Sequence, residues 1–574
     1  MCRVIISAIL WTVLAAFPVS ATTIHVPDDY PLIMDAMVFA TAGDTVLVEC
    51  GVYYEGNIQM KSGVTLMSET GQYNCAMIDA QNMSRVIECV DCDENTAIIG
   101  FTIAGGYVTS SMSYGGGISC SNSSPQLENL DIIVCQVRAV DAYGGGGLGC
   151  LNSSPTLTNV EFRGCVLVDA TAHGGGAMVV LGASSPTLDN VRFKMNWTTD
   201  SWGGALSVEG YGGQRVSMND VTFTGNSAAT SGGGMHVGGC TTVTGGVVFH
   251  DNWAPKGGGV HLETCRPCTL SDVTFTENTA ASGRGGGLLD ETSPDGTLTL
   301  TNATFLDNTA ATGGGGMACN AANLPTISYA TFARNSAATG GGLDVAGSAV
   351  KISNATFCGN DASSAGGGIY LDYTSSLDLD ASIIAYSTSG EAIGQWGYTP
   401  PVITCTDIYG NAGGDWVGVI APLGGINGNF TLDPLFCDAI NSDFTLAGDS
   451  PCLPPYNSCG VLIGAHGQGC PPATGLEDGG ESVVAVHPAT PNPFGHRTAL
   501  SYELPSAGMV GVRVFDVSGR LVRTLVDAEY QEAGPRTLVW NGRDDSGRPA
   551  ASGVYFFRVD IGGESMRRRA VLLR

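Results

Sequence analysis

The sequence is short of charge, and above all of positive charge. Charged residues make up 14% of its 574 residues, against roughly 25% in an average soluble domain. Lys and Arg number 25 against 53 Asp and Glu, so the net charge is −28. Nucleic acids and anionic membrane surfaces both attract basic patches. The composition therefore argues against both kinds of partner.

Long apolar runs are also scarce, because after the first residues no stretch is long enough for a transmembrane helix. Residues 4–17 form a short apolar run between Arg3 and the small residues Ser20 and Ala21. This order is typical of a secretory signal peptide with its cleavage site, although a buried N-terminal strand remains an alternative. We predict that residues 1–21 are a signal peptide and that the protein is secreted or displayed on the surface of a bacterium.

Recognisable catalytic signatures are missing as well. Enzymes that cleave polysaccharides need paired carboxylates, or clustered acids that bind calcium beside a basic residue. The Asn-Thr-Asp, Gly-His-Gly and Arg-Ile-Lys motifs of polygalacturonases do not occur. The sequence therefore predicts no catalytic residue, cofactor or metal ligand, with weak calcium binding left open. A site assembled from distant segments would escape this argument, so a polysaccharide lyase or glycoside hydrolase remains the alternative.

What the sequence has in excess is glycine, at 82 residues, and internal repetition. Phenylalanines recur 25 to 31 residues apart, and from Phe193 onward each is followed three residues later by asparagine. Upstream, Ile132 and Phe162 continue the series with Cys135 and Cys165 in the asparagine position. A repeat of this length is typical of a solenoid. The phenylalanine positions are Phe162, Phe193, Phe223, Phe249, Phe275, Phe305, Phe332 and Phe357.

Glycine clusters alternate with these motifs, and apolar residues at alternate positions follow them, as in Val260 and Leu262. That spacing is typical of a strand with one buried face. A Ser-Pro-x-Leu segment and a Val-x-Phe segment supply two more short strands in each repeat. One such coil cannot bury its own apolar face, but a stack of coils can. We therefore predict an all-β, right-handed parallel β-helix over residues 22–470, with an internal phenylalanine column and an asparagine ladder.

Cysteines follow the same spacing. Without Cys2 in the predicted signal peptide, 18 of the 19 cysteines remain, and exported proteins oxidise such cysteines in pairs. Equal offsets from the glycine clusters place like cysteines in neighbouring coils, near the Cα spacing of a disulfide. Buried cysteines acting as small apolar residues are the alternative. The predicted pairs are Cys120–Cys150, Cys135–Cys165 and Cys240–Cys265.

The alternation of Phe-x-x-Asn with glycine clusters, over about residues 97–385, resembles known repeats. It resembles the passenger repeats of chlamydial polymorphic outer-membrane proteins and of bacterial right-handed β-helix proteins in general. The resemblance implies the fold but little about function, and the sequence shows no C-terminal transmembrane barrel. Residues 24–55 are similar to the opening of pectinesterase-like β-helices, which implies a short helix covering the first coil.

A different module follows a linker predicted at residues 471–482. Residues 483–574 lose the glycine triplets and cysteines and gain arginine and alternating apolar segments, which predicts a small β-sandwich. Asn492-Pro493-Phe494, Trp540-Asn541-Gly542 and Gly553-Val554-Tyr555 resemble the C-terminal Ig-like domain of flagellar hook-cap proteins and the type IX secretion sorting domain. The resemblance implies a module for export or surface attachment, which binds the secretion or attachment machinery.

Two features of the repeat are candidate sites. His236 and His261 follow successive glycine clusters by two residues, where stacked imidazoles would face outward. They would need a further ligand to bind zinc, so a metal site and a chance surface pair both remain open. Met178, Leu206 and Leu289 are predicted in the same outward position, either as a binding groove or beneath a loop.

In the C-terminal module, Asn541, Asp544 and Asp545 form either a calcium site or a plain turn. No other cofactor or partner is indicated. The predicted function is a secreted or surface interaction protein, an adhesin or a glycan-binding or structural protein, whose partner is a cell-surface glycan or protein.

Overall fold

The computed structural model describes residues 21–574 apart from short segments. The segments outside the description are 171–173, 211–214, 240, 244, 264, 266, 293–296, 321–323, 398–399, 473–484, 487–488, 490, 493, 505–506, 517–519, 562–563 and 573–574. The chain divides into two compact units, Met1–Thr474 and Gly475–Arg574. The predicted signal peptide, except Ala21, and most of the predicted linker lie outside the described residues.

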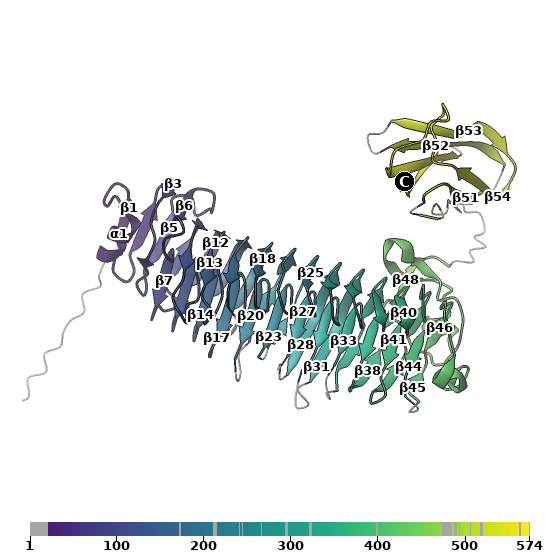
Figure 1. Ribbon diagram of the computed structural model, residues 1–574, viewed down its shortest axis with the longest axis horizontal. Helices are drawn as coiled ribbons and strands as arrows, with labels where there is room; N and C mark the ends of the chain where they lie inside the picture. Colours follow the sequence, from purple (N-terminus) through teal and green to yellow (C-terminus); the bar gives the residue numbers. More distant parts are fainter. Residues whose placement is uncertain are drawn as a thin grey trace, which may run out of the picture. The chain divides into compact units, whose positions relative to one another are not determined.

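The first unit is the predicted parallel β-helix. Its strands lie side by side along the solenoid axis, from β1 (Thr23–Val26) at one end to β46 (Asp407–Tyr409) near the other (Figure 1). The strand after each glycine cluster belongs to a 13-stranded sheet, sheet B. Its strands are β4 (Ile58–Gln59), β7 (Ile87–Val90), β11 (Ile118–Ser121), β14 (Leu148–Leu151), β17 (Met178–Leu181), β20 (Leu206–Glu209), β23 (Met235–Gly238), β27 (Val260–Leu262), β30 (Leu288–Asp290), β33 (Met317–Cys319), β37 (Leu343–Val345), β41 (Ile369–Leu371) and β44 (Ile393–Gln395).

The Ser-Pro-x-Leu and Val-x-Phe strands belong together to a 24-stranded sheet, sheet A. In β12, β15 and β18 the two segments form one continuous strand. Each strand bends at an asparagine with φ near 50°, which is Asn129, Asn159 or Asn190. Besides β1 and β46, the strands are β2 (Thr45–Val48), β3 (Gly51–Tyr53), β5 (Thr65–Ser68), β6 (Ala76–Asp79), β8 (Ala97–Ile99), β9 (Phe101–Ala104), β12 (Gln126–Ile133), β15 (Thr156–Arg163), β18 (Thr187–Lys194), β21 (Ser217–Asn219), β22 (Thr222–Thr224), β24 (Thr241–Val243), β25 (Val247–His250), β28 (Cys268–Thr276), β31 (Leu298–Leu306), β34 (Thr326–Ser328), β35 (Thr331–Ala333), β38 (Ala349–Ser353), β39 (Thr356–Cys358), β42 (Ser376–Asp380), β43 (Ile383–Ala385) and β45 (Val402–Thr404).

Many coils carry one more short strand that the sequence did not predict. It follows the asparagine position and forms two small parallel sheets of four and five strands. The first contains β10 (Tyr107–Val108), β13 (Gln136–Arg138), β16 (Val166–Val168) and β19 (Trp197–Thr198). The second contains β26 (Trp253–Ala254), β29 (Thr279–Ala280), β32 (Thr309–Ala310), β36 (Ser336–Thr339) and β40 (Asp361–Ala365).

The phenylalanines form the predicted internal column. Rings in neighbouring coils are stacked with centroids 4.6 to 5.1 Å apart, and every ring from Phe162 to Phe357 is buried. The spacing is that of parallel strands, about 4.8 Å, so the sheet register sets the stacking distance. The predicted register is confirmed.

The asparagines form the predicted amide ladder along one corner. Asn252 Nδ2 donates to Asn278 Oδ1 at 2.9 Å, and Asn278 Nδ2 donates to Asn308 Oδ1 at 2.9 Å. The same bond links each neighbouring pair from Asn196 to Asn360, at 2.9 to 3.0 Å. Each buried amide thus donates and accepts along the axis, so the ladder leaves these polar groups satisfied.

The glycine clusters make a corner that lies beside the asparagine ladder. Gly232 has φ of 65°, a conformation that side chains with a Cβ disfavour. A Cβ on Gly233 would lie 2.3 Å from the carbonyl oxygen of Gly258 in the next coil. Close stacking of backbone therefore requires glycine at this corner.

A helix covers the first coil, as the sequence predicted. Helix α1 (Ile33–Phe39) buries Ile33, Ala36 and Met37. The carboxylate of Glu55 accepts hydrogen bonds from the backbone N–H groups of Ile33 at 2.9 Å and Met34 at 3.0 Å. The helix shields the core at this end, while β1 pairs with β2.

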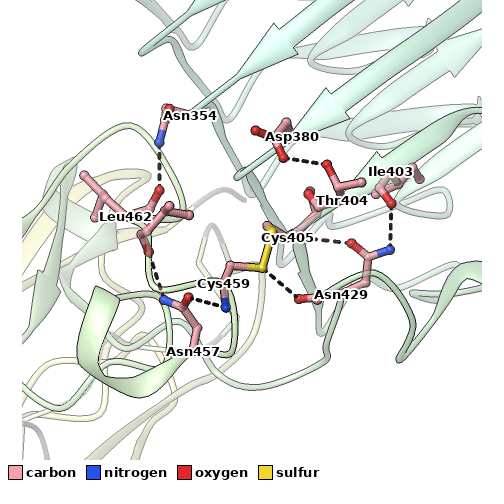
Figure 2. Close-up of a disulfide and its surroundings, with 12 residues drawn as sticks. Asn354, Asp380, Ile403, Thr404, Cys405, Asn429, Asn457, Cys459 and Leu462 are labelled. Carbon is pink, nitrogen blue, oxygen red and sulfur yellow. Dashed lines mark hydrogen bonds between the residues drawn. A yellow bond between two sulfur atoms is a disulfide. The ribbon is translucent and has the colours of Figure 1, made fainter.

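The other end is an irregular cap. It contains the 3₁₀ helices η1 (Gly418–Leu423), η2 (Ala439–Asn441) and η3 (Pro454–Tyr456) and the strands β47 (Phe436–Asp438), β48 (Asp443–Ala447) and β49 (Gln468–Cys470). The disulfides Cys405–Cys459 and Cys437–Cys470 join segments of the cap. Figure 2 shows Cys405–Cys459 beside the bond from Asn354 Nδ2 to the carbonyl oxygen of Leu462, at 2.7 Å, which ties the cap to a coil. Near the other end of the unit, a third disulfide joins Cys50 and Cys75.

The predicted cysteine pairs differ from the structure. Cys120 and Cys150 are partners in register, but both are buried thiols, as are Cys135, Cys165 and Cys265. Cys240 lies outside the described residues. Equivalent positions in neighbouring coils can form a disulfide, since Cys50 and Cys75 precede the register partners Gly51 and Ala76 and have Cα atoms 4.5 Å apart. The buried cysteines at the same kind of position nevertheless remain thiols. The Cα spacing alone was therefore an insufficient criterion.

The second unit, described by itself, is a small antiparallel β structure. A three-stranded sheet contains β50 (Ala485–Val486), β51 (Thr498–Leu504) and β54 (Gly534–Trp540), and a four-stranded sheet contains β53 (Leu521–Gln531), β52 (Gly508–Asp516), β55 (Gly553–Ile561) and β56 (Glu564–Leu572). Trp540 is fully buried against Phe494, Tyr555 and Phe557. This agrees with the predicted sandwich.

Candidate functional site

A charged groove lies on the outward face of sheet A, over β12, β15 and β18. Within these strands Asp131, Glu161 and Arg192 occupy one register position. Together with Arg163, these three residues line a cavity of about 420 Å³. We call this cavity the Arg192 groove; its lining residues are Gln72, Tyr73, Asn129, Leu130, Asp131, Asn159, Val160, Glu161, Arg163 and Arg192.

One side of the groove is a loop from an earlier coil. The hydroxyl of Thr102 donates to the carbonyl oxygen of Tyr73 at 2.8 Å, and the Cys50–Cys75 disulfide anchors the end of the loop. Asn129 Nδ2 donates to the carbonyl oxygen of Gly71 at 3.1 Å. These contacts hold the half-exposed Tyr73 ring at the groove.

A second amide ladder runs along the groove. Asn159 Nδ2 donates to Asn129 Oδ1 at 3.1 Å, and Asn190 Nδ2 donates to Asn159 Oδ1 at 2.7 Å. Unlike the internal ladder, this one is partly open to solvent, because Asn159 and Asn190 are not buried. Amides offer both donors and acceptors to a ligand rich in hydroxyl groups.

Ion pairs fix most of the charges in the groove. Arg163 Nη2 lies 2.6 Å from Asp131 Oδ2, and Lys194 Nζ lies 3.2 Å from Glu161. Arg192 is exposed and has no ion-pair or side-chain hydrogen-bond partner within the described ranges. Its guanidinium therefore presents all of its donors to the groove.

Asp131 is the most unusual group in the groove. It is 8% exposed, and its Oδ1 atom lacks a hydrogen-bond partner in the described part of the chain. Burial raises the pKa of this carboxyl above its ordinary value, although the charge of Arg163 opposes the rise. Since Oδ2 is taken by Arg163 and Oδ1 is shielded from solvent, the main effect of Asp131 is to orient Arg163.

The predicted histidine pair lies on another face, in sheet B. His236 and His261 are register partners in the same outward column, as the sequence indicated, but they are buried. Trp202 packs on His236 with ring centroids 5.3 Å apart. His236 lies between two carboxylates, with Nδ1 3.3 Å from Glu209 and Nε2 3.2 Å from Glu263.

The two imidazoles have opposite electrostatic surroundings. Burial alone would lower the pKa of His236, but the hydrogen bonds to Glu209 and Glu263 outweigh it and raise the pKa. For His261, burial dominates and lowers the pKa, although Nε2 lies 2.9 Å from Glu291. Lys256 also binds Glu291, at 2.8 Å. The cluster is a satisfied polar network and not an open surface pair.

The predicted outward apolar column is mostly wrong. Met178 and Leu206 are register partners of Leu148 and Met235, which point into the core, and both are fully buried there. Only Leu289 shares the outward column with His261. The prediction was off by one residue of register. One extra residue separates the glycine cluster from Met178 and from Leu206, and because successive side chains of a strand face opposite sides, both side chains point inward.

Two of the three predicted calcium ligands, Asp544 and Asp545, are occupied by arginine and backbone groups. Asp544 accepts hydrogen bonds from the backbone N–H groups of Ser546 and Arg548, both at 2.9 Å. Asp545 accepts from the backbone N–H of Thr524 at 3.0 Å. These contacts are those of a plain turn.

Among the described residues, Cys50, Glu69 and Cys75 bring three possible metal-ligand atoms close together. The two sulfurs form a disulfide, so this group offers no thiolate. Within the same residues, no helix is long and apolar enough to span a membrane.

The Arg192 groove was not predicted from the sequence, because its charged residues come from separate coils. A signal was present: Glu161-x-Arg163 and Arg192-x-Lys194 frame the two aligned phenylalanines Phe162 and Phe193. Residues that flank an inward-facing residue in a strand face outward. Writing the coils in register would therefore have placed these charges together.

Three solved structures share local similarity with the chain. Latent PorU of Porphyromonas gingivalis is 20% identical over 17% of this chain and 10% of its own, with a TM-score of 0.15. PorZ of the same organism, a surface component of the type IX secretion system, is 26% identical over 16% and 11%, with a TM-score of 0.12. The A-module of the mannuronan C-5 epimerase AlgE4 of Azotobacter vinelandii is 13% identical over 65% and 93%, with a TM-score of 0.20. The chain thus spans about a tenth of the first two proteins.

No curated protein matches the chain. Two family models match parts of it. Residues 204–384 match the right-handed β-helix region, and residues 494–563 match the FlgD Ig-like domain. The finer resemblances, to chlamydial polymorphic proteins and to type IX sorting domains, stay predictions. The chain therefore combines a β-helix solenoid with a C-terminal unit similar to the FlgD Ig-like domain.

Proposed function

We propose that this is a secreted or surface-displayed glycan-binding protein whose Arg192 groove holds an acidic sugar. The observation that carries the proposal is the exposed, unpaired guanidinium of Arg192 inside a groove of about 420 Å³. The charged lining residues are Asp131, Glu161, Arg163 and Arg192, and of these Arg192 alone has no ion-pair partner in the described part of the chain. A guanidinium fork binds carboxylates in two-point contacts, and the neighbouring amides suit sugar hydroxyls.

The geometry supports binding rather than turnover. Acid–base cleavage requires a carboxyl group that reaches the ligand. Asp131 has one oxygen on Arg163 and the other shielded, while Glu161 is held by Lys194. The carboxylates therefore position cations, and the cations contact the ligand. Degradation of polysaccharide remains the outcome that would replace this proposal.

The role of the C-terminal unit is also part of the proposal. Its similarity to the FlgD Ig-like domain over residues 494–563 supports a module for export or surface attachment. Deleting residues 483–574 should change the share of protein found in the medium against that on the cell surface. If the distribution between medium, surface and cell interior stays the same, the unit has another role.

Binding is tested with the mature chain from residue 22 and hexagalacturonate, with uncharged maltohexaose as comparator. We expect saturable hexagalacturonate binding that weakens as salt rises, since partly exposed ion pairs are screened. Arg192→Ala should weaken it about tenfold, because a charge-assisted hydrogen bond contributes roughly 1.5 kcal/mol. Equal affinity of Arg192→Ala and the unmutated chain would contradict the proposal.

The matched control is Lys351→Ala. Lys351 lies on the same sheet, in β38, is exposed and pairs with Asp378 at 3.6 Å. The Lys351→Ala substitution removes the same unit charge at a position outside the groove, so binding of hexagalacturonate should not change. A parallel assay for newly released reducing ends follows turnover, and release that Asp131→Asn abolishes would favour the enzyme.

A further inference from the structure

Two exposed tryptophans stand in one outward column of the solenoid. Trp197 begins β19 and Trp253 begins β26, and both follow an internal-ladder asparagine by one residue. Parallel bridges pair Trp197 with Ser227 and Ser227 with Trp253. The two indoles are thus two coils apart on the same face, with a small hydroxyl residue between them.

Both indoles are open to solvent. Trp197 is 42% exposed and Trp253 is 45% exposed, whereas every phenylalanine of the internal column is buried. In the described residues, neither indole N–H has a hydrogen-bond partner. A large amphipathic ring left exposed without a partner for its N–H is typical of a binding surface.

Spacing identifies the kind of ligand. Neighbouring coils lie about 4.8 Å apart, so two coils place the indoles about 10 Å apart along the axis. This is close to the length of a disaccharide in an extended β-1,4-linked hexose chain. In such a chain every second ring presents the same face, and that face carries C–H groups. The electron-rich face of an indole attracts the positive edges of C–H bonds.

We propose that Trp197 and Trp253 form a stacking platform for a β-1,4-linked polysaccharide of hexoses, laid along the solenoid axis. Each indole covers the apolar face of one sugar, and Ser227 lies beneath the sugar between them. The indole N–H groups then donate to sugar hydroxyls. The platform rests on the proposed glycan-binding function and adds a contact that needs no charge.

Trp197 is on the same coil as Arg192, five residues further along. The platform and the groove can therefore contact different parts of one polysaccharide, an arrangement that raises avidity. The two contacts differ in chemistry, because stacking is insensitive to salt and the ion pairs of the groove are not.

The test uses the mature chain with cellohexaose and chitohexaose, which are uncharged and β-1,4-linked, and with maltohexaose, which is α-linked. We expect binding of at least one β-linked hexamer, stronger than binding of maltohexaose and unchanged by salt. Trp197→Ala and Trp253→Ala should each weaken it about tenfold, and Trp253→Phe should retain part of the affinity. No β-linked binding, or equal binding of maltohexaose, overturns the proposal.

Two further variants test position. Trp396 is also exposed but lies outside the column, so Trp396→Ala should bind like the unmutated chain. Combining Trp253→Ser with Ser227→Trp keeps two exposed indoles but places them one coil apart, and this exchange should bind as weakly as Trp253→Ala. Full binding by the exchanged variant would refute the two-coil spacing. Circular dichroism and the thermal midpoint verify that each variant is folded.

The outcome separates the platform from the groove. Arg192→Ala should leave cellohexaose binding intact while it weakens hexagalacturonate binding. If Arg192→Ala has no effect on either ligand but the tryptophan variants lose cellohexaose, the groove proposal fails and the platform stands. If the tryptophan variants bind every hexamer as the unmutated chain does, the platform fails, whatever Arg192 does.

Discussion

The inward and outward faces of the same strands follow different rules. In β18, Phe193 points inward and stacks on Phe162 and Phe223, while its neighbour Arg192 points outward. Along the axis the inward position stays large and apolar, from Ile132 to Phe162 to Phe193. The outward position changes from Asp131 to Glu161 to Arg192. Stacking against similar neighbours constrains the residue type at inward positions, and nothing comparable constrains it at outward positions. The repeated residues therefore specify the fold, and the residues that differ between coils determine what the surface can bind.

The largest expected effect comes from breaking the inward column. Phe275 lies between Phe249 and Phe305, with ring centroids 5.1 and 4.7 Å away. Phe275→Ala should lower the free energy of unfolding by about 4 kcal/mol, because a cavity remains in a close-packed core. Guanidinium unfolding followed by circular dichroism measures the change. Outward Arg192→Ala should cost under about 0.5 kcal/mol, and comparable losses for both variants would erase the distinction.

The inner and outer amide ladders offer a sharper comparison. Asn278→Ala removes a buried amide that accepts from Asn252 and donates to Asn308 and to the carbonyl of Phe249. Because these partners are left unsatisfied, the loss should be about 3 kcal/mol. The outer control is Asn159→Gly, which suits φ of 55° and should cost under about 1 kcal/mol. A larger loss for Asn159→Gly in the same unfolding assay would contradict this ranking.

The same contrast explains what could be predicted from the sequence. The phenylalanine column and the asparagine ladder were predictable, because each depends on one residue recurring at a fixed offset. The fourth strand of the coil was not predictable, because no residue type recurs at its first position, which holds Trp197 in one coil and Thr279 and Thr309 in others. The face of Met178 was mistaken for a similar reason, since one extra residue after a glycine cluster reverses the strand.

The candidate sites were predictable only in part. His236 and His261 were placed in one column from their equal offsets, but a second column was overlooked. Its carboxylates, Glu209, Glu263 and Glu291, each stand two residues after the outward position of β20, β27 and β30. These carboxylates decide whether the imidazoles are exposed ligands or a closed network. The common offset of these carboxylates can be read from the sequence, but their contact with the imidazoles is seen only in the structure.

The internal ladder can be extended by one residue if the cysteine at its start is replaced by asparagine. Cys165 occupies the asparagine position, and its backbone N–H already donates to Asn196 Oδ1 at 2.9 Å. Its thiol makes only weak contacts, of which the shorter is 3.5 Å, to the carbonyl oxygen of Ile132. In Cys165→Asn the new amide should donate to both groups and stabilise the protein by about 1 kcal/mol. The unfolding midpoint measures this, and Cys165→Ala, without an amide, should give no gain.

The smallest effects are expected in the buried outward network, where they depend on pH. The folded-state pKa of His236 is raised, so its contribution to stability is complete below the unfolded pKa of about 6.5 and is lost as pH rises through the folded value. The pKa of His261 is lowered by burial, so the unfolded state takes up a proton first as pH falls below about 6.5, and stability declines there.

Replacing each histidine by glutamine should therefore flatten a different side of the stability profile. His236→Gln should reduce the loss of stability on the alkaline side, while His261→Gln should reduce the loss on the acidic side. Neither change should move the thermal midpoint by more than about 3 °C at any one pH. Thermal unfolding from pH 5 to pH 9 tests both variants. The hydrogen bonds of Glu209 and Glu263 set the direction for His236. For His261 burial sets the direction, helped by the charges of His236 and Lys256 and opposed by the contact with Glu291. If both variants changed the same side of the profile, the two imidazoles would titrate as one group, and the opposite surroundings of this pair would have no thermodynamic consequence.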